Sequence, residues 1–241
     1  MQFILTGKLN GVVYLHVAPS ELAMIKLKSS EWFILIGLLL LSLVPCVGGM
    51  LRLLELGSSA PLEVMPDNPR IKADPLPVVI HLVSAIPFCL LGAFQFLPSF
   101  RRRYPKGHGR AGRVLVVAGI FSGVSGLWMT HFYSFPNDLQ GDLLYIVRLL
   151  VGLAIVSFIL LRLYAVLKKR FAQHGASMIR AYALGQGAGT QVLVSIPWLA
   201  TVGEPSGVTR DVLMTLAWVI NVFVAEWIIR RGGSKNIPGR V

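Results

Sequence analysis

Six long apolar stretches are the feature of this chain that most limits how it can fold. A helix rises 1.5 Å per residue, so about 20 mostly apolar residues are enough to cross the hydrocarbon core of a bilayer. The stretches cover residues 32–51, 76–98, 114–134, 143–167, 182–202 and 212–229. This pattern predicts an all-α, polytopic membrane bundle of about six helices, forming one membrane domain over residues 32–229.

The composition supports a lipid-facing surface. Only 14% of the 241 residues are charged and 54% are hydrophobic, whereas a soluble domain usually carries about 25% charged residues. Such a chain lacks the polar groups needed to cover a water-soluble globule. We therefore expect its outer surface to face hydrocarbon.

The fifth stretch, "YALGQGAGTQVLVSIPWLATV", is the weakest of the six. Its first half consists largely of glycine and glutamine, which lower its apolar character. A full crossing is one interpretation, and a re-entrant or kinked segment is the alternative.

Positive charges predict the orientation of the bundle. Cytoplasmic loops of membrane proteins are enriched in Lys and Arg. Here the cations gather at both ends of the membrane domain and in alternate gaps, at Lys26, Lys28, Arg101, Arg102, Arg103, Lys106, Arg110, Arg113, Lys168, Lys169, Arg170, Arg180, Arg230, Arg231, Lys235 and Arg240. The other gaps hold most of the acidic residues. An even number of crossings with both termini cytoplasmic fits this alternation, and the net charge of +12 favours contact with anionic lipid headgroups.

The basic run "FRRRYPKGHGRAGR" at residues 100–113 has three interpretations: a nucleic-acid arm, a phosphate site or a water-facing loop. It contains no recognisable nucleic-acid module, and an apolar stretch lies on each side of it. We therefore interpret it as a cytoplasmic loop and expect no nucleic-acid partner.

The two ends of the chain differ from the membrane domain. Residues 1–31 form a predicted cytoplasmic segment that lacks the basic start and apolar core of a signal peptide. The sequence from Met24, "MIKLKSSEWFILIGLLLL", is more typical of a membrane-protein start, so we expect translation to begin there. Residues 230–241 form a basic cytoplasmic tail.

Ionisable side chains inside membrane helices are candidates for function, because placing them in hydrocarbon is costly. His81 and His131 lie near the outer ends of the second and third stretches, at a similar depth, and Arg148 lies near the outer end of the fourth. These three residues form a predicted outer cluster.

A second set lies toward the cytoplasm. His108 and His174 fall in the predicted basic loops, and Asn221 and Glu226 in the sixth stretch. For Glu226, pairing with Arg180, Arg230 or a loop arginine is the structural alternative to a functional role.

Two histidine pairs, one toward each face, are typical of a bundle that holds two haems by bis-imidazole ligation. His81 and His131 would ligate one haem b iron, and His108 and His174 are the inner candidates. Arg148 on one side and Arg110 or Arg113 on the other would pair with propionates. Interfacial polar caps are the alternative for these histidines.

Glycines recur at Gly119, Gly123 and Gly126 in the third stretch. Small residues at this spacing allow close helix packing. The alternative is clearance for a flat ligand between helices.

The stretch "IHLVSAIPFCLLGAFQFLPSFRRRYPKGHGRAGR", followed by "MIRAYA" and a later tryptophan, asparagine and glutamate, resembles a bacterial membrane family catalogued as domain of unknown function 2306. The matching positions are His81, Gly92, Gln95, Phe96, Arg101, His108, Gly112, Arg113, His174, Met178, Ile179, Arg180, Tyr182, Trp218, Asn221 and Glu226. The resemblance covers residues 76–229 and implies a multi-pass protein of the bacterial inner (cytoplasmic) membrane. Members of the family commonly carry an arginine midway along the helix after "RAYA", where this chain has Gln191.

The leading hypothesis is a protein that binds haem b or a quinone-like ligand and passes electrons across the membrane. One alternative is a non-redox transporter or sensor in which Glu226, Asn221, Gln186 and Gln191 contact a small molecule. Another is a scaffold for assembling a membrane complex. The chain has no GxSxG, HExxH or phosphate-loop motif, so any catalysis is expected to be that of a membrane oxidoreductase.

Overall fold

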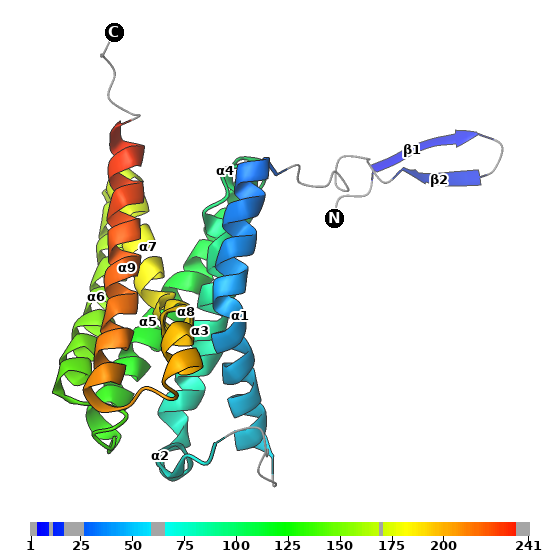
Figure 1. Cartoon of the computed structure of the whole chain (residues 1–241). Coiled ribbons are helices and arrows are strands. Elements are labelled where there is room, and N and C mark those ends of the chain that lie inside the picture. The colour runs from blue at the N-terminus through cyan, green and yellow to red at the C-terminus, as the bar shows by residue number, and fades with distance from the viewer. Residues whose placement is uncertain (1–3, 10–11, 17–26, 59–65, 169–170, 235–241) are drawn as a thin grey trace.

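The computed structural model describes residues 4–9, 12–16, 27–58, 66–168 and 171–234 (Figure 1). Strands β1 (Ile4–Leu9) and β2 (Val12–His16) pair as an antiparallel hairpin, with Ile4 opposite His16. The helices in the described residues are α1 (Ser29–Gly57), α2 (Pro69–Ala73), α3 (Pro75–Gln95), α4 (Pro98–Arg103), α5 (Pro105–Phe132), α6 (Asp142–Leu167), α7 (Phe171–Gly185), α8 (Gly187–Thr201) and α9 (Gly207–Ser234). Met24 lies outside the described residues.

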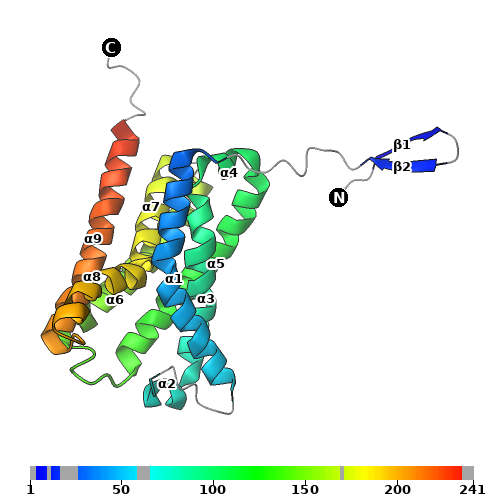
Figure 2. The same cartoon turned by 45° about the vertical axis from the view of Figure 1, so that its right-hand side comes forward.

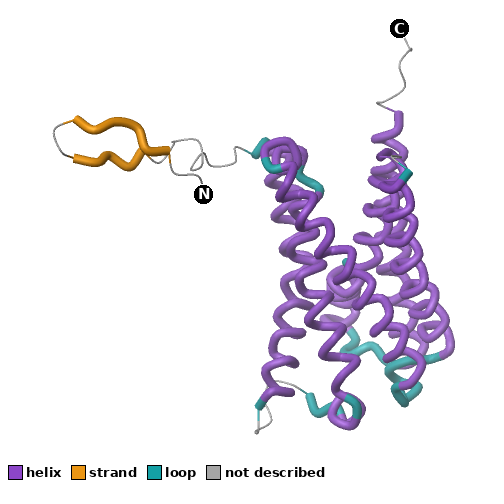
Figure 3. Tube along the Cα trace, turned by 180° about the vertical axis from the view of Figure 1, so that it is seen from behind, coloured by secondary structure: helices purple, strands orange, loops and turns teal. Residues whose placement is uncertain are grey.

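The helices form a polytopic bundle, as the sequence predicts. Five helices of the described part are long and apolar enough to cross a membrane: α1, α3, α5, α6 and α9. Helices α7 and α8 together make a sixth crossing, because the chain enters α7 at one end of the bundle and leaves α8 at the other (Figures 1 and 2). Most loops lie at the two ends of the bundle (Figure 3).

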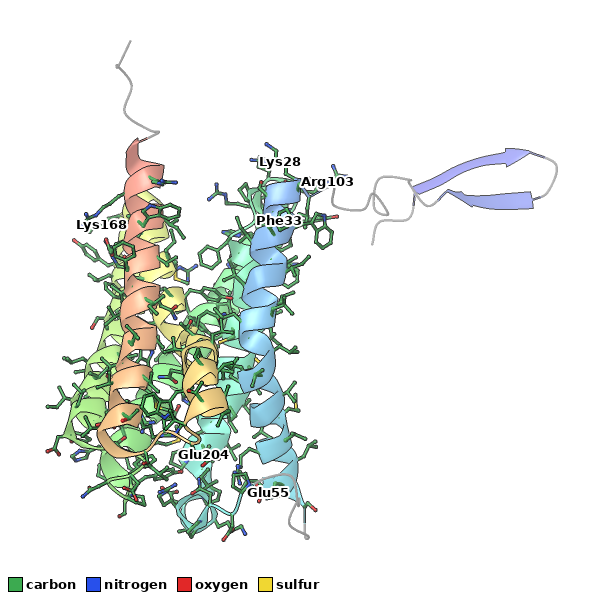
Figure 4. All side chains as sticks on the ribbon, viewed as in Figure 1. Lys28, Phe33, Glu55, Arg103, Lys168 and Glu204 are labelled. Atoms are coloured by element: carbon green, nitrogen blue, oxygen red, sulfur yellow. The ribbon has the colours of Figure 1, made fainter. Side chains whose placement is uncertain are left out.

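Charge separates the two ends. Lys28, Arg103 and Lys168 lie at the end where α1 begins and α9 finishes, and Glu55 and Glu204 lie at the opposite end (Figure 4). We call these the basic end and the acidic end. This arrangement agrees with the predicted alternation of charges, and the positive-inside rule assigns the basic end to the cytoplasm.

The outside of the bundle is apolar. Phe33 and Phe223 are 78% and 71% exposed, whereas Phe88 and Ile159 are almost fully buried in the core. The outer helices expose many large apolar side chains. Such side chains would be unfavourable in water, whereas in a bilayer they contact lipid chains. The surface therefore fits a bilayer environment.

The basic run is helical, so the prediction of a loop at residues 100–113 was wrong. Helix α4 begins at Pro98 and α5 at Pro105, and proline is well suited to a first helical position because its missing N–H needs no partner there. His108 consequently lies in the first turn of α5. The long cationic side chains reach water while the helix continues past the apolar layer.

The predicted loop around His174 was also wrong. Helix α7 begins at Phe171, eleven residues before the predicted start of the fifth crossing. His174 is therefore helical, although its side chain lies outside the described part of the structure.

Candidate functional site

A cavity of about 390 Å³ lies inside the bundle between α1, α3, α5, α6, α7 and α8. This volume falls within the ~300–1,000 Å³ typical of ligand pockets. At the acidic end the cavity is lined by α2 and the segment that follows α5, and its deep end reaches the junction of α7 and α8. It is the candidate functional site.

Glycines shape the walls of the cavity. Gly119, Gly123, Gly126, Gly152, Gly185 and Gly189 all line it. At Gly119 an added Cβ would lie 2.4 Å from Ile159 Cδ1, whereas at Gly126 it would lie 3.5 Å from His81 Cε1. Gly119 therefore allows close helix packing, and Gly126 keeps space open beside an imidazole. Both interpretations of the glycine series apply, at different positions.

His81 presents a hydrogen-bond acceptor to the site. Its Nδ1 lies 3.0 Å from the carbonyl oxygen of Ser122 and 3.3 Å from Ser125 Oγ. A carbonyl can only accept, so Nδ1 carries the hydrogen and Nε2 keeps its lone pair. Among the described residues Nε2 has no hydrogen-bond partner, and the side chain lines the cavity. A ligand hydroxyl could donate to it.

Arg148 lies at the acidic end of the cavity. It donates to Gln140 Oε1 and lies 3.9 Å from Met214 Sδ. Its guanidinium is 5.3 Å from the centroid of the Phe135 ring, and the guanidinium of Arg70 is 4.8 Å from the same centroid. Two cations therefore converge on one aromatic side chain that lines the cavity.

Two carboxylates of this end, those of Asp67 and Asp211, are bonded to groups other than Arg70 and Arg148. Asp67 pairs with Lys72 at 2.5 Å, and hydrogen bonding and charge from Lys72 lower the pKa of Asp67 while Asp67 raises the pKa of Lys72. Asp211 of α9 accepts hydrogen bonds from the backbone N–H groups of Gly141 and Leu144, which caps the start of α6.

A hydrogen-bonded polar group closes the deep end of the cavity. Gln186 Nε2 donates to Tyr182 Oη at 2.7 Å and to Ser42 Oγ at 2.9 Å. Tyr182 Oη in turn donates to the backbone oxygen of Cys89 at 2.7 Å. Because these buried polar atoms are paired, they fix the geometry of the site without a large desolvation penalty.

The fifth crossing breaks at Gln186. Its N–H still bonds to Tyr182 oxygen at 2.9 Å, and its own carbonyl accepts from both Gly189 N–H at 3.1 Å and Thr190 N–H at 3.3 Å, which begins a new helix at Gly187. Figure 2 shows α8 running obliquely to α7 beyond this point. The stretch is therefore kinked at Gln186, and α7 and α8 together still run from one end of the bundle to the other.

The structure does not bring His131 to the cavity. The residue is exposed, its Nδ1 lies 2.9 Å from Tyr145 Oη, and its ring packs edge-on against Phe132. His81 lines the cavity and His131 does not. The outer cluster therefore reduces to His81 and Arg148.

The inner candidates whose side chains the structure describes do not share one site either. His108 is partly buried at the start of α5, and Arg113 is exposed. Arg180 forms a bidentate ion pair with Glu226, with N···O distances of 2.5 and 3.0 Å. Pairing with Arg180 is the structural alternative to a functional role for Glu226. Asn221 donates to Ala183 oxygen and accepts from Thr190, which ties α7 and α8 to α9.

Some lining residues carried no signal in the sequence. Arg70 lies in a gap that is rich in acidic residues and Phe135 directly follows the third apolar stretch, and no sequence pattern singles out either residue. Gln191, at the position where a family arginine is expected, does line the cavity, and its Nε2 lies 3.4 Å from Met214 oxygen. Arg70 of α2 and Arg148 of α6 approach the same Phe135 ring, which is a tertiary feature.

These features define a multi-pass helical membrane protein with a ligand-sized cavity in its core. The family model described as "Predicted membrane protein (DUF2306)" matches residues 78–229. The chain belongs to this family, and the match includes every crossing after α1. Comparison with curated proteins and with solved structures found no match.

Proposed function

We propose that the protein binds a flat, lipid-soluble ligand of the quinone and quinol class in the cavity between its helices. One observation carries this proposal: a mostly apolar, glycine-lined cavity contains an imidazole whose Nε2 is an unpaired acceptor. A quinol hydroxyl would donate to His81 Nε2. The walls, which include Phe88 and Trp218, suit an aromatic ring.

A second contact supports the same ligand class. Arg148 and Gln191 both line the cavity and carry N–H donors that can bond to a quinone or quinol oxygen. Sites of this kind combine apolar walls with a few placed polar groups. These residues are sufficient to bind the ligand. Electron transfer requires in addition a second redox group that exchanges electrons with the bound ligand.

Haem b fits this site less well. The hydrogen bond from His81 Nδ1 to a backbone oxygen is the arrangement that orients a metal-ligating histidine, so His81 suits one axial position. The partner expected for it, His131, lies outside the cavity lining. A bis-imidazole site formed by these two residues would require α5 to turn or unwind near its end.

Binding can be tested with tetramethylhydroquinone, kept reduced under argon, in equilibrium dialysis against protein-containing nanodiscs and empty nanodiscs. We expect saturable binding that His81→Ala weakens about 2- to 10-fold, the effect of one neutral hydrogen bond. His131→Ala is the matched control and should bind like the wild type. Binding that does not saturate, or that is equal in both variants, would refute the proposal.

The same nanodiscs test haem directly. An absorption spectrum is recorded for the oxidised and the dithionite-reduced protein. A Soret band that disappears in His81→Ala would assign the site to haem in place of a quinol. The quinol proposal expects no such band.

Transport of a small molecule is the second candidate, and the break between α7 and α8 favours it. Interrupted helices beside a cavity at mid-membrane are typical of transporters. Cys46 lines the cavity, so its reaction with an impermeant maleimide, in a Cys89→Ser background in sealed vesicles, reports access. Labelling only from the acidic-end side supports a binding site, and labelling from both sides supports transport.

A further inference from the structure

We infer that the ligand of the cavity carries an anionic group, bound between Arg70 and Arg148 at the acidic end. This inference rests on the proposed function, because it specifies the ligand of the same cavity. We call Arg70, Phe135 and Arg148 the arginine clamp.

The charge of the cavity lining is one-sided. Arg70 and Arg148 line it, and the described lining residues include no aspartate or glutamate. A cavity with cations at one end and apolar walls elsewhere favours an amphiphile whose charged group is negative. A neutral quinol would add no negative charge beside these two guanidinium groups.

Asp211 attracts Arg148 while Arg210 and Arg70 repel it, and the groups that Arg148 contacts directly in the described part of the chain are uncharged. These are the side-chain oxygen of Gln140, the sulfur of Met214 and the face of Phe135. A cation inside a bundle normally pairs with a carboxylate, since removing it from water is costly. The described salt bridges do not include Arg148, so an anion from the ligand would complete its environment.

Arg70 is in a similar state. Its Nε is buried and has no hydrogen-bond partner among the described residues. Its guanidinium packs over Phe135, the ring that Arg148 also approaches. Two like charges on one ring repel each other, and an anion between them would relieve that repulsion while accepting hydrogen bonds from both.

The placement of the clamp gives the ligand a direction. Arg70 belongs to α2 at the acidic end, and His81 lies in the second turn of α3, deeper in the bundle. The anionic group would therefore face the acidic end, the hydroxyl would meet His81, and the ring would point toward Gln186. An aromatic hydroxy acid has this arrangement of groups.

Two probes that differ only in charge test the inference: 1-hydroxy-2-naphthoate and its neutral amide, 1-hydroxy-2-naphthamide. Binding of each is measured by dialysis against nanodiscs of zwitterionic lipid, with empty nanodiscs as background. We expect the wild type to bind the acid about 10- to 100-fold more tightly than the amide, the range for charge-assisted hydrogen bonds.

Variants of the clamp assign the preference. Arg148→Gln and Arg70→Gln should lose most of the preference for the acid. Arg70→Gln should keep its affinity for the amide, and Arg148→Gln should bind the amide up to about 10-fold more weakly, because Arg148 also donates to a neutral ligand oxygen. Arg148→Lys retains the charge and should keep part of the preference. Saturable binding of the amide also shows that each variant is folded.

The outcomes separate the two proposals. If acid and amide bind the wild type equally while His81→Ala weakens both, the anionic inference is overturned and the quinol-class site stands. If neither probe binds above the empty nanodiscs, both proposals are overturned.

Discussion

Among the glycines in the described part of the chain, Gly189 is the one whose added Cβ would lie closest to backbone atoms of another helix. A Cβ at this residue would lie 2.0 Å from the backbone oxygen of Leu41 and 2.8 Å from its carbonyl carbon. Because these are backbone atoms of α1, they cannot rotate aside. Gly189→Ala must therefore move α8 away from α1 by about 1 Å or more to restore an ordinary contact.

The change in the free energy of unfolding caused by Gly189→Ala is the sum of two opposing contributions. Overpacking a tight contact costs about 1–3 kcal/mol, and a clash with backbone belongs near the upper end of that range. Alanine in place of glycine gains about 1 kcal/mol of helix propensity. We expect a net loss of about 2 kcal/mol, which lowers the Tm of a chain of this length by roughly 4–8 °C.

Thermal unfolding in detergent, followed by intrinsic fluorescence, measures this difference. Gly48→Ala is the matched control, since no atom lies within 4 Å of its added Cβ, and helix propensity should leave its Tm equal or higher. A Gly189→Ala protein as stable as Gly48→Ala would refute the close approach of α8 to α1.

Three further variants test separate parts of the structure. Tyr182→Phe removes the acceptor of Gln186 and the donor to Cys89, so we expect a loss of about 1–3 kcal/mol in detergent unfolding, against little change for Tyr164→Phe on the exposed surface. Asp211→Ala leaves two backbone N–H groups at the start of α6 without their acceptor and should destabilise by a similar amount, with Asp211→Asn intermediate. Gly126→Ala adds a methyl at ordinary contact distance from His81, so its Tm should be preserved while dialysis shows weaker binding of tetramethylhydroquinone; unchanged binding would mean that the ligand does not lie beside His81.

Much of the fold was predictable because lipid imposes simple rules. A crossing needs about 20 apolar residues, and cations remain on the cytoplasmic side, so apolar length and charge alone predict the crossings and place Lys28 and Lys168 at the same end. Helix ends were predicted less well. Apolar content predicts where a helix leaves the hydrocarbon core. Helix α5 already begins at Pro105, before its apolar stretch, because backbone hydrogen bonding does not stop at that boundary.

The candidate site was predictable only in part. Depth along a helix follows from residue number, which correctly placed His81 and His131 near the acidic end. The direction of a side chain around the helix depends on how neighbours pack, and it separates the two histidines: His81 faces the cavity and His131 faces Tyr145. Arg70 had no signal of its own, since its role depends on its side chain reaching the Phe135 ring that Arg148 also approaches.

Gln186 shows why the cavity and the broken helix are one feature. Gly185, Gln186, Ala188 and Gly189 all line the cavity, so the space lies at the point where α8 departs from the direction of α7. A polar side chain at this depth must have hydrogen-bond partners, and Gln186 finds them in Tyr182 and Ser42. Because Ser42 belongs to α1, the second bond also fastens the α7–α8 junction to that helix. Gly189, one of the glycines that weakened the apolar signal of this stretch, lets α8 pass close to Leu41. The least regular crossing is therefore the one that shapes the binding site.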